Sequence, residues 1–330
     1  MGGGRWSTNV YKEKEDARKR SGKSAFAYSD QAKRSGKLKA HESLDPMDVG
    51  VRESRDSDEH PESNSIMVFF DVTGSMGQVP VGLQKYLPQL LGLLLYKNYV
   101  PHPQIFFGAV GDAYTDRVPL QVGQFESDNR MDEHLQNIVL EGGGGGQKRE
   151  SYDLAFYFAS RHTAMDCWDK RGVKGYLFII GDEMGYPNIL KAQVNALMGD
   201  GLEADIPIEE IVQEVKQKFN LFYIIPQGAH YGKDQEVSGY WKDLLGEQHV
   251  VELSDPQDVA ETIALIIGTS EGTIGLDEGL EHLREFGTDA DRLSNISKAL
   301  SMHTGNSSLV KGKGGSLSNL DNKKSGTRRL

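Results

Sequence analysis

The sequence predicts an α/β protein built on a doubly wound, mostly parallel β-sheet. Between about residues 64 and 268, segments with strand character alternate with segments of helical periodicity. That alternation is typical of a parallel sheet covered by helices on both faces. Residues 66–70 and 176–180 are continuous apolar runs, as central strands buried on both faces should be. These two runs are therefore predicted to lie in the middle of the sheet.

The other elements are predicted from the periodicity of apolar residues and from Gly, Pro and Asp residues that mark the ends of helices and strands. Residues 120–125 alternate apolar and polar side chains, which indicates a half-exposed edge strand. Asp255 and Pro256 open a helix, with Asp as the cap and Pro at the first helical position. Further strands are expected at 105–110, 221–225 and 250–253, and helices at 81–99 (with a kink at Pro88), 130–139, 150–163, 189–197, 208–219, 237–245, 276–285 and 289–301.

Four regions are predicted along the chain. Residues 1–63 are polar and charge-rich, which favours a disordered or extended arm draped over the body, with the apolar island at 25–28 as a docking point. Residues 64–268 form the α/β domain, and 269–303 add C-terminal helices. The basic stretch 304–330, rich in Gly, Ser, Asn and Lys, is typical of a flexible tail.

Composition excludes several classes of protein. The 330 residues contain no apolar run near the roughly 20 residues that span a bilayer, so a membrane protein is not expected. The net charge of −11 makes nucleic acid an improbable partner for the body of the protein. One cysteine, Cys167, rules out an internal disulfide framework and predicts a reducing, cytoplasmic location.

The loop after the first central strand is the main candidate site. Asp71, Thr73 and Ser75 place side-chain oxygens at alternate positions around Gly74. In a tight turn this spacing can bring three oxygens to one point, and hard cations such as Mg²⁺ and Ca²⁺ prefer oxygen ligands. The other interpretation is that Asp71 and Thr73 cap the helix that follows; the segment alone does not separate the two.

This loop resembles the metal-ion-dependent adhesion site of the von Willebrand factor A (vWA) family. That site begins with Asp-x-Ser-x-Ser after the first strand, and this chain has Asp71-x-Thr73-x-Ser75, which keeps the hydroxyl. The family also supplies an Asp after its fourth strand, where Asp182 stands in this sequence. The resemblance covers about residues 64–268 and implies a divalent metal, Mg²⁺, Ca²⁺ or Mn²⁺, bound at the sheet edge.

The third element of the family's site differs in this chain. The family usually places a Thr after a Gly-Gly pair, but here Gly142–Gly146 is followed by Gln-Lys-Arg-Glu150, and Glu150 occupies the Thr position. We interpret Glu150 as a substitute ligand, with a plain first-turn Glu stabilised by the helix dipole as the alternative. Asp112, after the next strand, is expected on the same edge, either supporting a ligand or capping its own loop.

The resemblance implies an intracellular, metal-binding protein-interaction module rather than an enzyme. Members of the family often act as adaptors for AAA+ ATPases or stress-response complexes, so such a partner is expected. Two alternatives remain open. One is a haloacid dehalogenase-like, Mg²⁺-dependent phosphatase or phosphotransferase with Asp71 as the nucleophile, which lacks the usual acid/base Asp because residue 73 is Thr. The other is a structural adaptor with an empty metal site.

Overall fold

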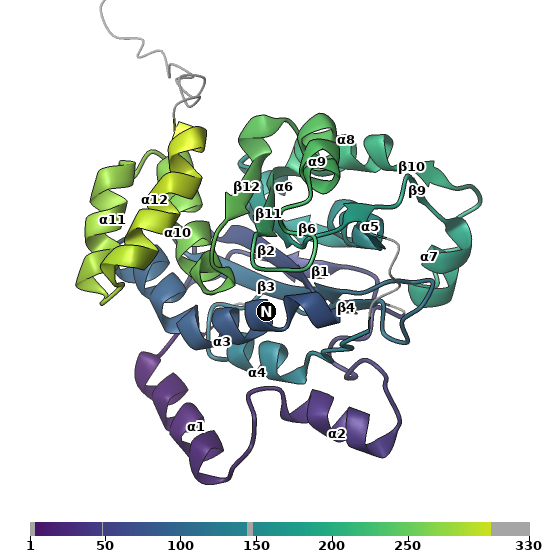
Figure 1. Cartoon of the computed structure of the whole chain (residues 1–330), viewed down its shortest axis with the longest axis horizontal. Coiled ribbons are helices and arrows are strands. Elements are labelled where there is room, and N and C mark those ends of the chain that lie inside the picture. The colour runs from purple at the N-terminus through teal and green to yellow at the C-terminus, as the bar shows by residue number, and fades with distance from the viewer. Residues whose placement is uncertain (1–3, 48, 144–147, 305–330) are drawn as a thin grey trace, which may run out of the picture.

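A six-stranded, mostly parallel sheet forms the centre of the computed structural model (Figure 1). The structure describes residues 4–47, 49–143 and 148–304, without the side chains of Ser75 and 302–304. The strand order is β12-β11-β7-β2-β3-β4, and only β4 runs antiparallel to its neighbour. The strands are β2 (Asn64–Asp71), β3 (Pro103–Val110), β4 (Leu120–Val122), β7 (Gly175–Ile180), β11 (Phe219–Pro226) and β12 (Val250–Leu253).

The chain winds outward from β2 in both directions. The strands β3 and β4 extend the sheet on one side of β2, and β7, β11 and β12 extend it on the other. The predicted α/β class and mostly parallel sheet are therefore correct. Three pairs of short strands lie outside this sheet: β1 (Arg52–Ser54) with β6 (Thr163–Met165), β5 (Arg149–Glu150) with β8 (Met184–Gly185), and β9 (Asn188–Ile189) with β10 (Ile206–Pro207).

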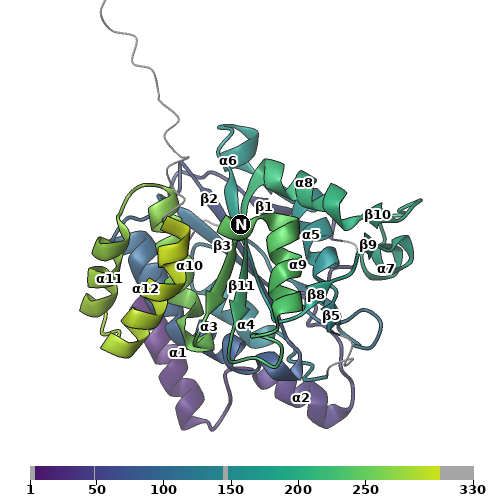
Figure 2. The same ribbon diagram turned by 45° about the horizontal axis from the view of Figure 1, so that its top comes forward.

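Helices cover both faces of the sheet (Figures 1 and 2). The side chains of β2 divide accordingly: Ile66, Val68 and Phe70 pack in one apolar core, and Met67 and Phe69 pack in the other. The first core includes residues of α3 (Gln78–Leu91), α10 (Val259–Ser270), α11 (Leu276–Glu285) and α12 (Ala290–Thr304). The second includes residues of α5 (Tyr152–Arg161), α8 (Ile208–Lys218) and α9 (Gln235–Leu245). Burial on both faces is the physical reason for the continuous apolar runs.

Smaller helical segments complete the fold. The helix expected at 81–99 is α3 followed by a π-helical turn, η2 (Gly92–Tyr96), with Pro88 inside α3. The predicted cap is present, because the Asp255 side chain accepts a hydrogen bond from the Gln257 amide. The other segments are α4 (Arg130–Asn137), α6 (Asp166–Asp169), α7 (Lys191–Leu197), η1 (Gly74–Met76), η3 (Glu247–His249) and η4 (Pro256–Asp258). None of the helices within the described ranges has both the length and the apolarity to cross a bilayer.

The edge strand β4 differs from its prediction, because all of its residues are buried. The side chain of Gln121 exchanges two hydrogen bonds with the backbone of Val139, at 2.8 and 2.9 Å, which satisfies its amide in the interior. On the outer edge, the Val122 amide donates to the Leu44 carbonyl. The polar residue that suggested exposure is thus paired with protein groups instead of water.

The N-terminal arm, residues 4–47, is ordered over the body rather than extended. It contains α1 (Thr8–Arg20) and α2 (Ala27–Ser35), which lie beside α3 and α4 (Figure 1). The buried Tyr11 hydroxyl donates to the Gln84 carbonyl at 2.6 Å, and Arg18 forms an ion pair of 2.9 Å with the fully buried Asp132. Residues 4–47 are therefore not disordered: they lie against the body of the protein. They do so as two helices, which the polar composition of this region did not predict. The tail beyond residue 304 lies outside the described residues.

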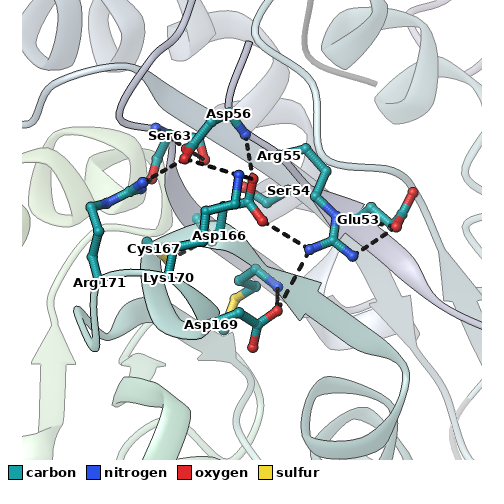
Figure 3. A network of polar contacts seen from close by, with 12 residues as sticks. Glu53, Ser54, Arg55, Asp56, Ser63, Asp166, Cys167, Asp169, Lys170 and Arg171 are labelled. Carbon is teal, nitrogen blue, oxygen red and sulfur yellow. Dashed lines mark hydrogen bonds and ion pairs between the residues drawn. The ribbon is translucent and has the colours of Figure 1, made fainter.

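A network of charged groups joins residues 53–63 to α6 at the opposite end of β2 from Asp71 (Figure 3). Asp166 is almost fully buried and accepts hydrogen bonds from the Arg55 side chain, the Asp56 amide and Lys170. Arg171 in turn pairs with Asp56 at 2.7 Å. Burial opposes ionisation of Asp166, but these donors outweigh it and lower its pKa. The network therefore holds the segment before β2 against the body.

Candidate functional site

Three carboxylates lie at the carboxyl-end edge of the sheet. Asp71 is the last residue of β2, Asp182 comes two residues after β7, and Asp112 comes two residues after β3. These strands are parallel neighbours, so their ends meet at one edge, where ligands bind in open α/β sheets. All three side chains are fully buried. The predicted location of the site thus follows directly from the topology.

Asp71 is held by three hydrogen-bond donors. Its Oδ1 accepts from both the amide and the hydroxyl of Thr73, each at 2.6 Å. Its Oδ2 accepts from the hydroxyl of Tyr152 at 3.0 Å. Burial raises the pKa of Asp71 above its ordinary value, the Thr73 donors lower it, and the nearby charge of Asp182 raises it further. Thr73 therefore acts on Asp71 directly. Thr73 is the N-cap residue of η1, but its side chain makes no capping hydrogen bond with the described residues, so the capping interpretation of this loop is not observed.

Tyr152 was not identified as a site residue from the sequence. It is the first residue of α5 and belongs to none of the motifs that the sequence offers. Its ring packs edge-on against Tyr223 and Trp241, while its hydroxyl reaches Asp71. The hydroxyl of a buried Tyr needs a hydrogen-bond partner. That requirement is the signal that could have pointed to Tyr152 as a site residue.

Glu150 lies beside this cluster in a different local structure from the one expected. It belongs to the short strand β5, opposite Gly185 of β8, and α5 begins only at Tyr152. The first-turn interpretation of Glu150 is therefore wrong, because the residue precedes the helix. Its side chain is fully buried, and within the part of the chain that the structure describes neither carboxylate oxygen has a hydrogen-bond partner. Burial raises the pKa of Glu150, and the charges of Asp71 and Glu183 add to the effect.

The other predicted residues have separate environments. Asp182 Oδ2 accepts a hydrogen bond from the Tyr231 amide at 2.8 Å. The Asp112 carboxylate accepts from the Tyr114 amide and the Tyr186 hydroxyl at the rim. Ser75 lies in the short 3-10 turn η1, and its side chain is outside the described part of the chain.

Glu183 is a second acidic residue that the sequence reasoning did not select. It is 6% exposed, and burial, with the charges of Asp71 and Asp182, raises its pKa to about 7. Its carbonyl accepts hydrogen bonds from Tyr223 and Trp241, which hold the backbone after Asp182 in place. The adjacent pair of acidic residues after β7 was the signal for it.

Glycines bring two loops together at this edge. The Gly142 amide donates to the Val72 carbonyl at 3.1 Å, and the Gly74 amide donates to the Gly143 carbonyl at 2.9 Å. A Cβ atom on Gly74 would lie 3.2 Å from the Gly142 carbonyl oxygen, which explains a glycine there. The glycine run thus contacts the Asp71 loop through its first two residues, and Gly144–Gly146 lie outside the described residues.

The cluster brings several buried carboxyl groups to one edge of the sheet, and burial raises the pKa of Asp71, Glu150 and Glu183. Burying an unpaired carboxylate is costly, so such a group either binds a proton or faces a cation. Within the described residues, no three Asp, Glu, His or Cys side chains are grouped closely enough to hold one metal ion. The carboxylates of Asp71, Glu150 and Asp182 are therefore not grouped closely enough to coordinate one ion together in this arrangement. Among the described residues, neither oxygen of Glu150 has a donor, and the same holds for the buried Asp153 on α5.

Comparisons with known proteins assign no family. No family model and no curated protein matches the sequence. Among solved structures, the pilus adhesin SpaC from Lactobacillus rhamnosus GG is similar at a TM-score of 0.46 and 8% identity, over 66% of this chain and 31% of the adhesin. The proximal thread matrix protein 1 of the mussel byssus is similar at 0.41 and 9% identity, over 63% and 46% of the two chains. This chain thus spans about a third of the adhesin and under half of the matrix protein.

Proposed function

We propose that this protein is a metal-binding protein-interaction module with a vWA-like, doubly wound fold. The proposal rests on the environment of Glu150: its carboxyl group is fully buried, is close enough to Asp71 for their charges to interact, and accepts no hydrogen bond from the described residues. A divalent cation supplies the missing positive charge and prefers oxygen ligands. The winding of strands outward from β2, with Asp71 at its end, supports the same interpretation.

The proposed ligands are Asp71, Thr73, Ser75, Glu150 and Asp182, whose carboxylates would have to draw closer together around a bound ion than they lie in the metal-free arrangement. When bound, Mg²⁺, Ca²⁺ or Mn²⁺ would offer an electropositive point to a partner. The residues themselves orient one another: Thr73 and Tyr152 fix the Asp71 carboxylate, and the Tyr231 amide fixes Asp182. Such outer hydrogen bonds hold metal ligands in position. Because several carboxylates share the edge, the site is proposed to hold its cation without a carboxylate from a partner.

A binding role is favoured over phosphoryl transfer. The phosphatase alternative needs an acid or base at residue 73, which is Thr in this chain. The hydroxyl of Thr73 also donates to Asp71 instead of standing apart as an acid or base. The proposed partner is a protein inside the cell, with an AAA+ ATPase or a stress-response complex suggested only by the resemblance to vWA adaptors.

The test is an affinity purification of three forms of the full chain: wild type, Asp71→Ala, and the exposed control Asp16→Ala. Each is captured with Mn²⁺ or with EDTA, and each is titrated with Mn²⁺ by calorimetry. We expect wild type and Asp16→Ala to bind metal and to retain the same partner with Mn²⁺ only. A calorimetrically silent wild type, together with partners insensitive to EDTA, would refute the proposal.

A further inference from the structure

Helix α2 of the N-terminal arm lies next to the backbone that borders the candidate site. Ser29 of α2 is 2% exposed, and its Oγ accepts a hydrogen bond of 2.9 Å from the Leu140 amide. The ammonium group of Lys33, on the same helix, lies near Gly142: a Cβ atom placed on Gly142 would be 3.4 Å from Lys33 Nζ. The arm therefore reaches a segment more than a hundred residues away in the sequence, at the start of the glycine run.

The same segment is bonded directly to the Asp71 loop. Gly142 donates to the Val72 carbonyl, and the Gly143 carbonyl accepts from Gly74. Val72 and Gly74 flank Thr73, whose amide and hydroxyl both donate to Asp71. Hydrogen bonds, together with the backbone of residues 140–143 and 72–74, thus link Ser29 to the Asp71 carboxylate.

Other hydrogen bonds anchor residues 139 and 141 to the body, whereas residue 140 is held by the arm. Val139 is fixed to the body by Gln121, so the segment is anchored on its N-terminal side. Glu141 accepts from the amides of Arg117 and Val118, which belong to the loop after β3. The Leu140 amide between these anchors is satisfied by the arm. Both Gly142 and Gly143 are exposed, so their backbone depends on these few bonds for its position.

We propose that Ser29 is a positioning residue for the metal site, through which α2 holds residues 140–143 against the Asp71 loop. The inference rests on the proposed metal-binding function. The arm then does more than cover the body: a change that lifts α2 loosens the loop that carries Asp71 and Thr73. Since coupling between two sites is reciprocal, metal binding at the sheet edge must also stabilise the arm.

The test uses the full chain as wild type, Ser29→Ala and Ser35→Ala. Ser35 is the matched control, because it is an exposed serine at the end of the same helix, and its side chain bonds to Ala32 and Lys37 of the arm itself. Mn²⁺ affinity is measured by calorimetry. We expect Ser29→Ala to bind roughly threefold to tenfold more weakly, the ratio that corresponds to one lost hydrogen bond, and Ser35→Ala to bind as wild type does.

Amide hydrogen exchange gives a second readout that needs no substitution. In the wild type, Mn²⁺ should slow exchange in 140–143 and also in α2, whereas a purely structural arm would show no response to metal. Metal binding with unchanged exchange in α2, or with equal affinity in the two serine variants, would overturn the role of Ser29 and leave the metal site standing. If the wild type binds no Mn²⁺, the metal proposal fails. Ser29 is then judged by exchange alone: faster exchange of 140–143 in Ser29→Ala than in Ser35→Ala supports its positioning role, and equal exchange overturns it.

Discussion

Replacing Glu150 by Gln tests whether this carboxyl group is kept protonated in the metal-free protein. Burial, together with the charges of Asp71 and Glu183, raises the pKa of Glu150 from 4.5 to about 11. The folded state then retains a proton that the unfolded state releases above its own pKa. A group with a raised folded pKa makes stability fall as pH rises, so the wild type should lose free energy of unfolding between about pH 5 and pH 8.

The size of the effect follows from the two pKa values. Each pH unit corresponds to about 1.4 kcal/mol per proton, and pH 8 lies about 3.5 units above the unfolded value of 4.5. The penalty at pH 8 is therefore about 5 kcal/mol, as an upper value if neighbouring carboxyls do not take up the proton instead. That is a large part of the roughly 5–15 kcal/mol that stabilises a typical domain. Gln keeps the shape of the side chain and removes the proton-binding group.

The assay is urea unfolding in EDTA at several pH values for wild type, Glu150→Gln and the exposed control Glu133→Gln. The stability gain of Glu150→Gln over wild type should grow by about 1.4 kcal/mol per pH unit from pH 5 to pH 8, whereas Glu133→Gln should stay within about 0.5 kcal/mol of wild type. With saturating Mn²⁺ the order should reverse, because wild type gains the metal-binding free energy and the variant loses a ligand. Parallel pH profiles for wild type and Glu150→Gln would refute the reasoning.

Three further results are expected. A 100-fold excess of Mg²⁺, Ca²⁺ or Mn²⁺ over its Kd should stabilise the wild type by about 2.7 kcal/mol, and Asp71→Ala should remove this shift; melting that ignores both metal and EDTA would contradict it. An aryl phosphate should not be hydrolysed in a metal-dependent way, and turnover lost in Asp71→Ala would instead support the phosphatase alternative. Arg18→Ala should lower the free energy of unfolding by about 2–3 kcal/mol because it leaves the buried Asp132 without its cation. The matched change Lys14→Ala at an exposed ion pair should have an effect below about 1 kcal/mol, and equal losses in the two variants would show that the arm does not depend on the buried pair.

The sequence by itself determined the class of fold and the position of the candidate site. Continuous apolar runs such as 66–70 can be buried on both sides only in a sheet with two covered faces, and β2 occupies that place. An Asp directly after such a strand must lie at the carboxyl-end edge, as Asp71 and Asp182 do. These features depend on periodicity and chain direction, which are local properties of the sequence.

The tertiary structure decided the partners of each side chain. The sequence did not select Tyr152 and placed Glu150 at the start of a helix. In the structure Tyr152 donates to Asp71, and Glu150 lies buried in a two-residue strand with no donor among the described residues. The ordering of the N-terminal arm is equally non-local. Helix α1 has a strongly polar sequence, and it is held by groups such as Gln84 and Asp132 that come much later in the chain. Such contacts join residues far apart in the sequence, and neither segment carries a periodic pattern of apolar residues that predicts them. Only the folded chain reveals them.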